Sequence, residues 1–147
     1  MINKLKLYWE LVTKNVYQYN INYFEIKDFL EKKFPKCYVE ITDLYKKTCG
    51  YKTLKSLAKL VPAKYLKWRK EDRDCEDISM IALGAWKLTF PKLPIGLCFA
   101  DVRGGKKHAL LCAVYKTSSE RLRFIFIEPQ TGKIFDTCDL RPYLIII

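Results

Sequence analysis

The chain contains a single histidine, His108, and this residue limits the acid–base chemistry available to it. Histidine ordinarily titrates near neutral pH, so a base working near pH 7 has one imidazole candidate. Cys75 precedes it at the start of an expected helix, and Glu128 follows an expected strand. A cysteine at a helix start, a histidine opening a strand and an acid after the next strand predict a thiol hydrolase.

Each of these three residue types suits a role in such a site. A thiol attacks as the thiolate, and the positive end of a helix favours that form while its N–H groups can hold an oxyanion. We therefore predict Cys75 as the nucleophile, His108 as the base and Glu128 as the acid that orients the imidazole. The ordinary alternatives are a buried cysteine, a structural histidine and a glutamate that begins a turn.

Helices are expected mainly in the first half of the chain. Apolar spacing predicts an amphipathic helix over 2–19, and Asn22 is a candidate cap for a second helix that Pro35 would stop after Phe34. A short strand over 37–41 and a helix over 53–61 follow, and the segment 65–69 is either an edge strand or a loop over the site. A helix over 75–88 is apolar nearly all round, so we expect burial on most sides, with a close neighbour at Gly84.

Strands are expected in the second half, over 95–102, 108–116 and 122–127, with short additional strands over 133–135 and 143–147. The connections 103–106 and 117–120 are typical of hairpins. Helices followed by an antiparallel sheet predict an α+β fold, which we expect to form one domain over 1–147, with a helical part over 1–64.

Composition narrows the possible partners. The 147 residues carry a net charge of +11, and residues 1–74 hold 17 Lys or Arg against 9 acids. Such a basic half fits a nucleic-acid or acidic protein partner, or simply a solvated lysine surface. No apolar run is long enough to span a membrane, and no secretory signal is visible, so we expect an intracellular protein. Six scattered cysteines without a CxxC pair argue against structural zinc.

Three segments carry a resemblance to a known family: Arg73–Asp77, His108–Ala109 and Ile127–Gly132. Together they resemble the papain-like cysteine protease domain at the C-terminus of the Marasmius oreades agglutinin, with its microbial and phage relatives. The resemblance covers about residues 65–136. It implies a papain-like arrangement of a central buried helix bearing the cysteine, a Cys-His-Glu triad at the three residues named above, and dependence on calcium or manganese.

Three acids surround the predicted nucleophile: Asp74, Glu76 and Asp77. Bare carboxylates would raise the pKa of a nearby thiol, whereas a bound divalent cation reverses that effect. We therefore predict that these acids include ligands for Ca²⁺ or Mn²⁺, which prefer oxygen. Glu76 stands where the family usually carries Asp. Alternatively, Asp74 is a helix N-cap with Asp77 as its capping-box partner.

The resulting functional prediction is a cysteine peptidase that cleaves a peptide or isopeptide bond in a peptide or protein substrate, in a microbe, phage or virus. One alternative is a cell-wall peptide hydrolase or acyltransferase of the same fold. Another is a non-enzymatic basic module that binds nucleic acid or protein and keeps the fold without turnover.

Overall fold

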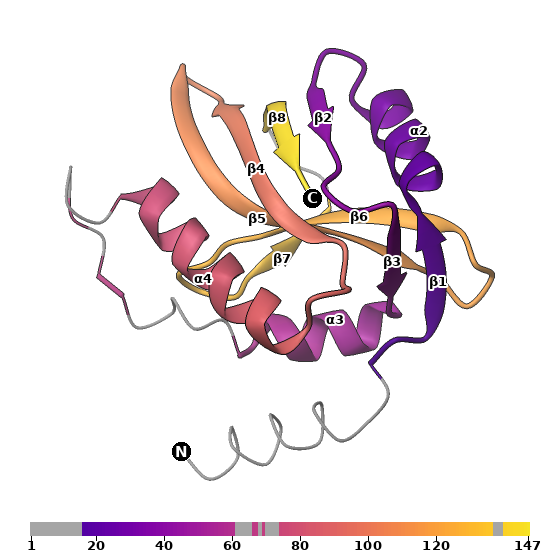
Figure 1. Cartoon of the computed structure of the whole chain (residues 1–147). Helices are drawn as coiled ribbons and strands as arrows, with labels where there is room; N and C mark the ends of the chain where they lie inside the picture. Colours follow the sequence, from indigo (N-terminus) through magenta and orange to yellow (C-terminus); the bar gives the residue numbers. More distant parts are fainter. Residues whose placement is uncertain (1–15, 61–65, 68, 70–73, 137–139) are drawn as a thin grey trace, which may run out of the picture.

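A computed structural model describes residues 16–60, 66–67, 69, 74–136 and 140–147 of the chain (Figure 1). The described helices are α2 (Tyr23–Lys33), α3 (Tyr51–Ala58) and α4 (Cys75–Thr89). The strands are β1 (Tyr19–Asn22), β2 (Tyr38–Glu40), β3 (Tyr45–Thr48), β4 (Ile95–Val102), β5 (Lys106–Lys116), β6 (Leu122–Ile127), β7 (Ile134–Phe135) and β8 (Arg141–Ile146). This confirms the predicted α+β class. The predicted division into one domain with a helical part over 1–64 stays a prediction.

Six strands form the main sheet in the order β2-β8-β4-β5-β6-β7, and β1 pairs with β3 in a separate two-stranded sheet. The prediction of an antiparallel sheet is only partly right, because β2 runs parallel to β8 at its edge. That pairing joins segments about a hundred residues apart, and no local pattern encodes it.

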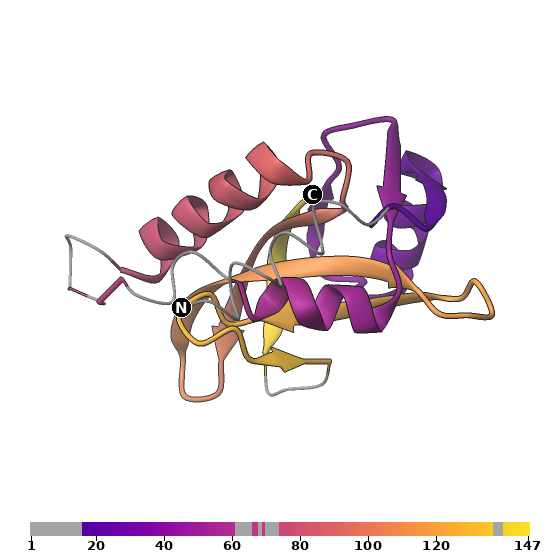
Figure 2. The ribbon, with the colours of Figure 1, turned by 90° about the horizontal axis from the view of Figure 1, so that it is seen from below.

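The strand β5 lies at the centre of the molecule and is buried on both faces. Its residues Leu111 and Ala113 pack into a core with α3 and α4, whereas Leu110 and Cys112 pack into a second core with α2. This alternation follows from the two-residue period of a strand. Figure 2 shows α4 running along the sheet and α2 at the other end of the molecule from the start of α4.

Local signals explain why several elements begin and end where they do. The Asn22 side chain accepts from the Glu25 N–H, and Glu25 accepts in return from the Asn22 N–H, which closes a capping box at the start of α2. The helix ends at its C-cap, Phe34, one residue before Pro35. Among the described residues, no helix is long and apolar enough to cross a membrane.

Two expectations about α4 are wrong. One face of the helix is exposed, with Met80 at 51%, Ile81 at 48% and Leu88 at 89% of full exposure. Gly84 has no neighbour within 4 Å of the position a Cβ would take. The close approach occurs instead at Gly96 in β4, where a Cβ would overlap the carbonyl of Ile146 in β8.

The helix predicted over 2–19 is wrong for the part of that range that the structure describes. Residues 16–18 are not helical, and β1 begins at Tyr19. The remainder of the predicted helix over 2–19 lies outside the described residues. So does part of segment 65–69, of which Leu66, Lys67 and Arg69 are described.

Candidate thiol site

Helix α4 begins at Cys75 because Asp74 caps it. The Asp74 side chain accepts from the N–H groups of Glu76 at 3.0 Å and Asp77 at 3.3 Å. These are N–H groups that would otherwise lack a partner in the first turn. The partly exposed Cys75 thiol therefore lies on the first turn of the helix, as predicted, beside its positive end.

The first two turns of α4 are fastened to β5 at one residue, Ala109. The Cys75 Sγ accepts from the Ala109 N–H at 3.4 Å, and the buried Ser79 hydroxyl donates to the Ala109 carbonyl at 3.1 Å. Cys75 and Ser79 are four residues apart and so share one face of the helix. The N–H and the carbonyl of Ala109 thus together set the position of the Cys75 thiol along β5.

The imidazole lies next to this contact. His108 directly precedes Ala109 in β5, and its Nε2 is 2.9 Å from the Glu128 Oε2. The His108 side chain is 31% exposed and that of Glu128 is 21% exposed, so the pair is partly shielded from water. With Nε2–H donating to the carboxylate, Nδ1 is the nitrogen left to exchange a proton with another group.

A tight turn after β6 holds Glu128 in place. The Gly132 N–H donates to the Glu128 carbonyl at 2.8 Å, and the Gln130 N–H donates to the Glu128 Oε1 at 3.3 Å. Gly132 has φ +71°, and a Cβ there would overlap the carbonyl of Ala58 at the end of α3. The turn therefore requires glycine at this position and packs directly on α3.

The three predicted residues come from α4, β5 and the turn after β6, and the fold brings them together around Ala109. Among the described residues no hydrogen bond joins the Cys75 sulfur to the imidazole itself. The arrangement provides a thiol at a helix start, a neighbouring imidazole and a carboxylate that fixes the ring. Chemically, this is a set of groups able to form and use a thiolate.

The other described thiols differ from Cys75 in their surroundings. Burial raises the pKa of Cys37 to about 11 and that of Cys49 to about 12. It also raises the pKa of Cys112 well above its ordinary value, and Cys98 is fully buried. These four groups therefore stay protonated or inaccessible near neutral pH. Cys138 lies outside the described residues.

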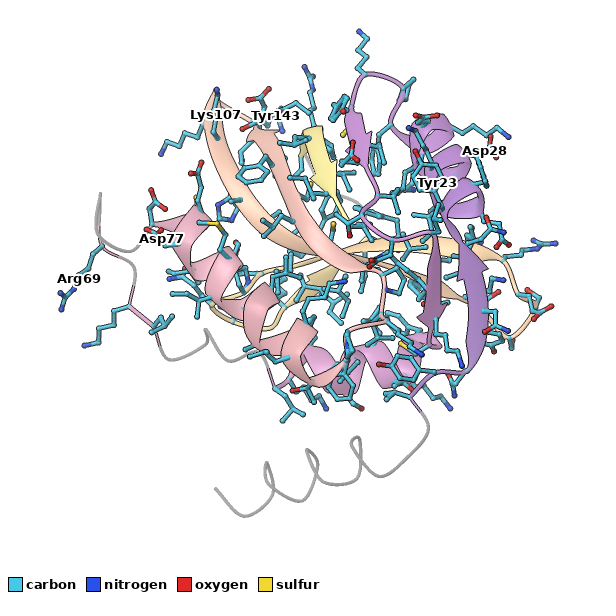
Figure 3. All side chains as sticks on the ribbon, viewed as in Figure 1. Tyr23, Asp28, Arg69, Asp77, Lys107 and Tyr143 are labelled. Atoms are coloured by element: carbon cyan, nitrogen blue, oxygen red, sulfur yellow. The ribbon has the colours of Figure 1, made fainter. Side chains whose placement is uncertain are left out.

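The predicted metal ligands, Asp74, Glu76 and Asp77, lie at and next to the start of α4. Within the described part of the chain, no group of three or more His, Cys, Asp or Glu side chains converges to hold a metal ion. Asp74 is occupied as the N-cap of α4, which favours its alternative interpretation. Figure 3 shows Asp77 at the first turn of the helix, on the side away from β4. Binding of Ca²⁺ or Mn²⁺ by Asp74, Glu76 and Asp77 stays a prediction without a supporting cluster.

Sequence reasoning missed Ser79 and the backbone of Ala109. Ser79 offered one usable signal, because it is a hydroxyl four residues after Cys75 in an otherwise apolar stretch. Ala109 offered none, since its contribution comes from main-chain atoms that every residue but proline carries.

Comparison with known proteins gives structural matches only. No family model matches the chain, and no curated protein matches it. The structure of a PSL1a-E64 complex superposes with a TM-score of 0.71 and 20% identity, covering 88% of this chain and 50% of that one. A structure of Polyporus squamosus lectin bound to a Neu5Aca2-6Galb1-4GlcNAc epitope gives 0.69 and 18%, with the same coverage.

These findings contradict the predicted family and function. Both structures are of Polyporus squamosus lectin, a carbohydrate-binding protein, and neither is named as a peptidase. The assignment to papain-like cysteine proteases, the cysteine peptidase activity and its hydrolase or acyltransferase alternative are corrected on this basis. The alternative prediction of a non-enzymatic basic module that binds nucleic acid or protein is corrected as well.

The chain spans about half the length of the two structures it matches. At 20% and 18% identity, the likeness shows a shared fold and nothing finer. The α+β architecture described above is therefore also found in about half of each Polyporus squamosus lectin chain.

Proposed function

We propose that Cys75, His108 and Glu128 form a reactive thiol site that binds an electrophilic ligand covalently. One observation carries the proposal: the Cys75 sulfur accepts from the N–H of Ala109, and the adjoining His108 is held by Glu128 at 2.9 Å. A thiol from the start of α4 and a carboxylate from the turn after β6 thus contact two adjacent residues of β5, Ala109 and His108.

Each group has a defined role in this proposal. His108 takes the thiol proton at Nδ1, because Nε2 is engaged with the carboxylate. Glu128 fixes the tautomer and stabilises the imidazolium that results. The start of α4 and the Ala109 N–H stabilise the thiolate of Cys75, which is the nucleophile.

An epoxide illustrates the reaction. The thiolate attacks one ring carbon, a sulfur–carbon bond forms, the carbon–oxygen bond breaks, and the imidazolium proton passes to the resulting alkoxide. The product is a stable thioether, and no other reactant is required. E64, the compound in the PSL1a complex, is an epoxide and is therefore a suitable probe.

The test is incubation of the whole chain with E64, followed by peptide mass spectrometry and a time course of adduct formation. We expect one adduct, on Cys75, and none in Cys75→Ala. His108→Ala should slow alkylation by about tenfold or more, since the thiolate then forms without its base. Cys37→Ser is the matched control, because Cys37 is also partly exposed but has no imidazole beside it, and its rate should equal that of the native chain.

Three outcomes would contradict this proposal. They are an adduct on Cys37 or spread over several cysteines, an unchanged rate in His108→Ala, and no adduct at all in a chain whose circular dichroism shows that it is folded.

A second candidate is glycan binding, which the lectin structure with its sialylated epitope favours. Because this chain covers half of that lectin, the bound epitope belongs either to the matched half or to the other one. Calorimetric titration with Neu5Aca2-6Galb1-4GlcNAc, and with the same glycan lacking its sialic acid, tests this candidate. Saturable heat with the sialylated glycan alone would support it, and no heat with either would count against it.

A further inference from the structure

A surface pocket of about 410 Å³ is lined by residues of β1, the start of α2, β3 and the turn after α4. Figure 1 shows β1, β3 and the start of α2 on the opposite side of the molecule from the start of α4, where the thiol lies. Lys46, Lys47 and Lys92 line it, and we call it the lysine pocket. The Lys47 N–H donates to the Lys92 carbonyl at 3.0 Å, so the two segments are tied together at the pocket.

One of these lysines is fully buried. The Lys46 side chain has 0% exposure, and its Nζ is 2.7 Å from the Asp43 Oδ2. This hydrogen bond lowers the pKa of the Asp43 carboxyl. An ammonium group taken out of water needs compensating negative charge, and Asp43, whose side chain is 57% exposed, supplies it only from the surface.

A second ammonium group, that of Lys87, acts on Asp43 and Lys46 through its charge, although it does not line the pocket. Lys87 of α4 donates from Nζ to the Leu93 carbonyl at 3.0 Å. Burial, together with the charge of Lys46, lowers the pKa of Lys87 to about 8, whereas Asp43 acts to raise it. Lys46 and Lys87 therefore repel each other across a single shared acid.

The acid that lines the pocket, Glu25, is engaged elsewhere. Its Oε2 accepts from the Asn22 N–H in the capping box of α2. Its Oε1 lies 3.7 Å from the Nζ of Lys116. The lining of the pocket thus carries three lysines, Lys46, Lys47 and Lys92, against one acid that is already engaged.

We propose that the lysine pocket binds a tetrahedral oxyanion, the phosphate group of a small phosphomonoester or free phosphate. Lysines act as mobile point charges toward phosphate oxygens, and Lys47 and Lys92 are exposed on the rim where they can close on such a group.

The experiment is an amide NMR titration of the whole chain with sulfate, inorganic phosphate and glucose 6-phosphate in separate arms. We expect saturable shifts confined to residues 20–25, 45–47 and 92. Lys47→Ala with Lys92→Ala should weaken binding about tenfold or more, because two of the ligand's charge partners are removed. Lys106→Ala with Lys107→Ala is the matched control, with the same loss of charge on the exposed β4–β5 hairpin.

The arms separate the sources: tighter binding of glucose 6-phosphate than of phosphate identifies an ester, and equal binding identifies the free ion. The proposal is overturned if shifts are unsaturable or spread over the chain, or if the hairpin control weakens binding as much as the pocket variant does. Neither result depends on Cys75, so the reactive-thiol proposal stands or falls separately.

Discussion

His108 and Glu128 form a 2.9 Å contact between β5 and the turn that follows β6. Although β6 pairs with β5 up to Ile127 opposite Leu111, the acid lies just past the end of that ladder. The position of the Glu128 carboxylate is therefore set by the turn after β6 and not by strand pairing. The orientation of the imidazole depends on that turn as well as on β5.

The first prediction concerns this contact. Glu128→Ala should slow E64 alkylation of Cys75 by about tenfold, because the imidazole loses the group that fixes its tautomer and stabilises its charged form. Glu128→Gln keeps a hydrogen-bond acceptor without the charge and should give an intermediate rate. Rates are measured from adduct formation. An Ala variant as fast as the native chain would remove Glu128 from the site.

The second prediction concerns the anchor between α4 and β5. Ser79→Ala leaves the buried Ala109 carbonyl without the Ser79 hydroxyl, and we expect a loss of about 1–3 kcal/mol in the free energy of unfolding. Urea denaturation measures it. The matched control is Ser56→Ala in α3, where the exposed hydroxyl bonds only its own helix. Equal losses in the two variants would contradict the anchoring role.

The third prediction separates the backbone strain of a positive φ from steric overlap with a neighbouring carbonyl at Gly132. Gly132→Ala meets both a positive φ of 71° and the Ala58 carbonyl, whereas Gly104→Ala meets a φ of 95° in open space. We expect Gly104→Ala to cost about 1 kcal/mol and Gly132→Ala clearly more, with slower alkylation of Cys75 as the Glu128 turn shifts. Thermal unfolding of both variants tests this. A smaller cost at Gly132 would show that the turn yields easily.

The fourth prediction is a pH dependence of stability. The folded state lowers the pKa of Lys87 from 10.5 to about 8, so between these values the unfolded chain binds the extra proton. Lys87 should therefore make a contribution to the free energy of unfolding that increases as the pH rises above 8. Raised cysteine pKa values oppose it above about pH 9. Urea midpoints at pH 7.5–9 should rise less steeply in Lys87→Met, and an identical slope would contradict the shift.

Local chemistry made part of the fold predictable. The capping pair at Asn22 and the stop at Pro35 placed α2, and the apolar runs at 95–102 and 122–127 placed β4 and β6 with their observed bounds. Strands β1 and β3 were missed because they are short and polar, with Lys46 and Lys47 in the second. Their strand geometry comes from pairing with each other and from the contact of β3 with β5, which is tertiary information.

The proximity of Cys75, His108 and Glu128 was predictable from their residue types and order, whereas the contacts of Ser79 and Ala109 that hold Cys75 were not. Cys75, His108 and Glu128 each stand at or near the end of an element, where side chains reach a common surface. Of the three acids near Cys75, Asp74 has a structural role that a helix start requires, because its side chain caps α4. The peptidase assignment went further than these residues allow, and the structural likeness to a lectin corrects it.

The contact at Ala109 has an evolutionary consequence. Because main-chain atoms make it, a substitution at position 109 that preserves the strand also preserves the link to Cys75, with proline as the exception. Position 109 can therefore change during evolution while the Cys75 thiol keeps its position. Related chains are therefore better recognised by superposing their backbones than by aligning their sequences.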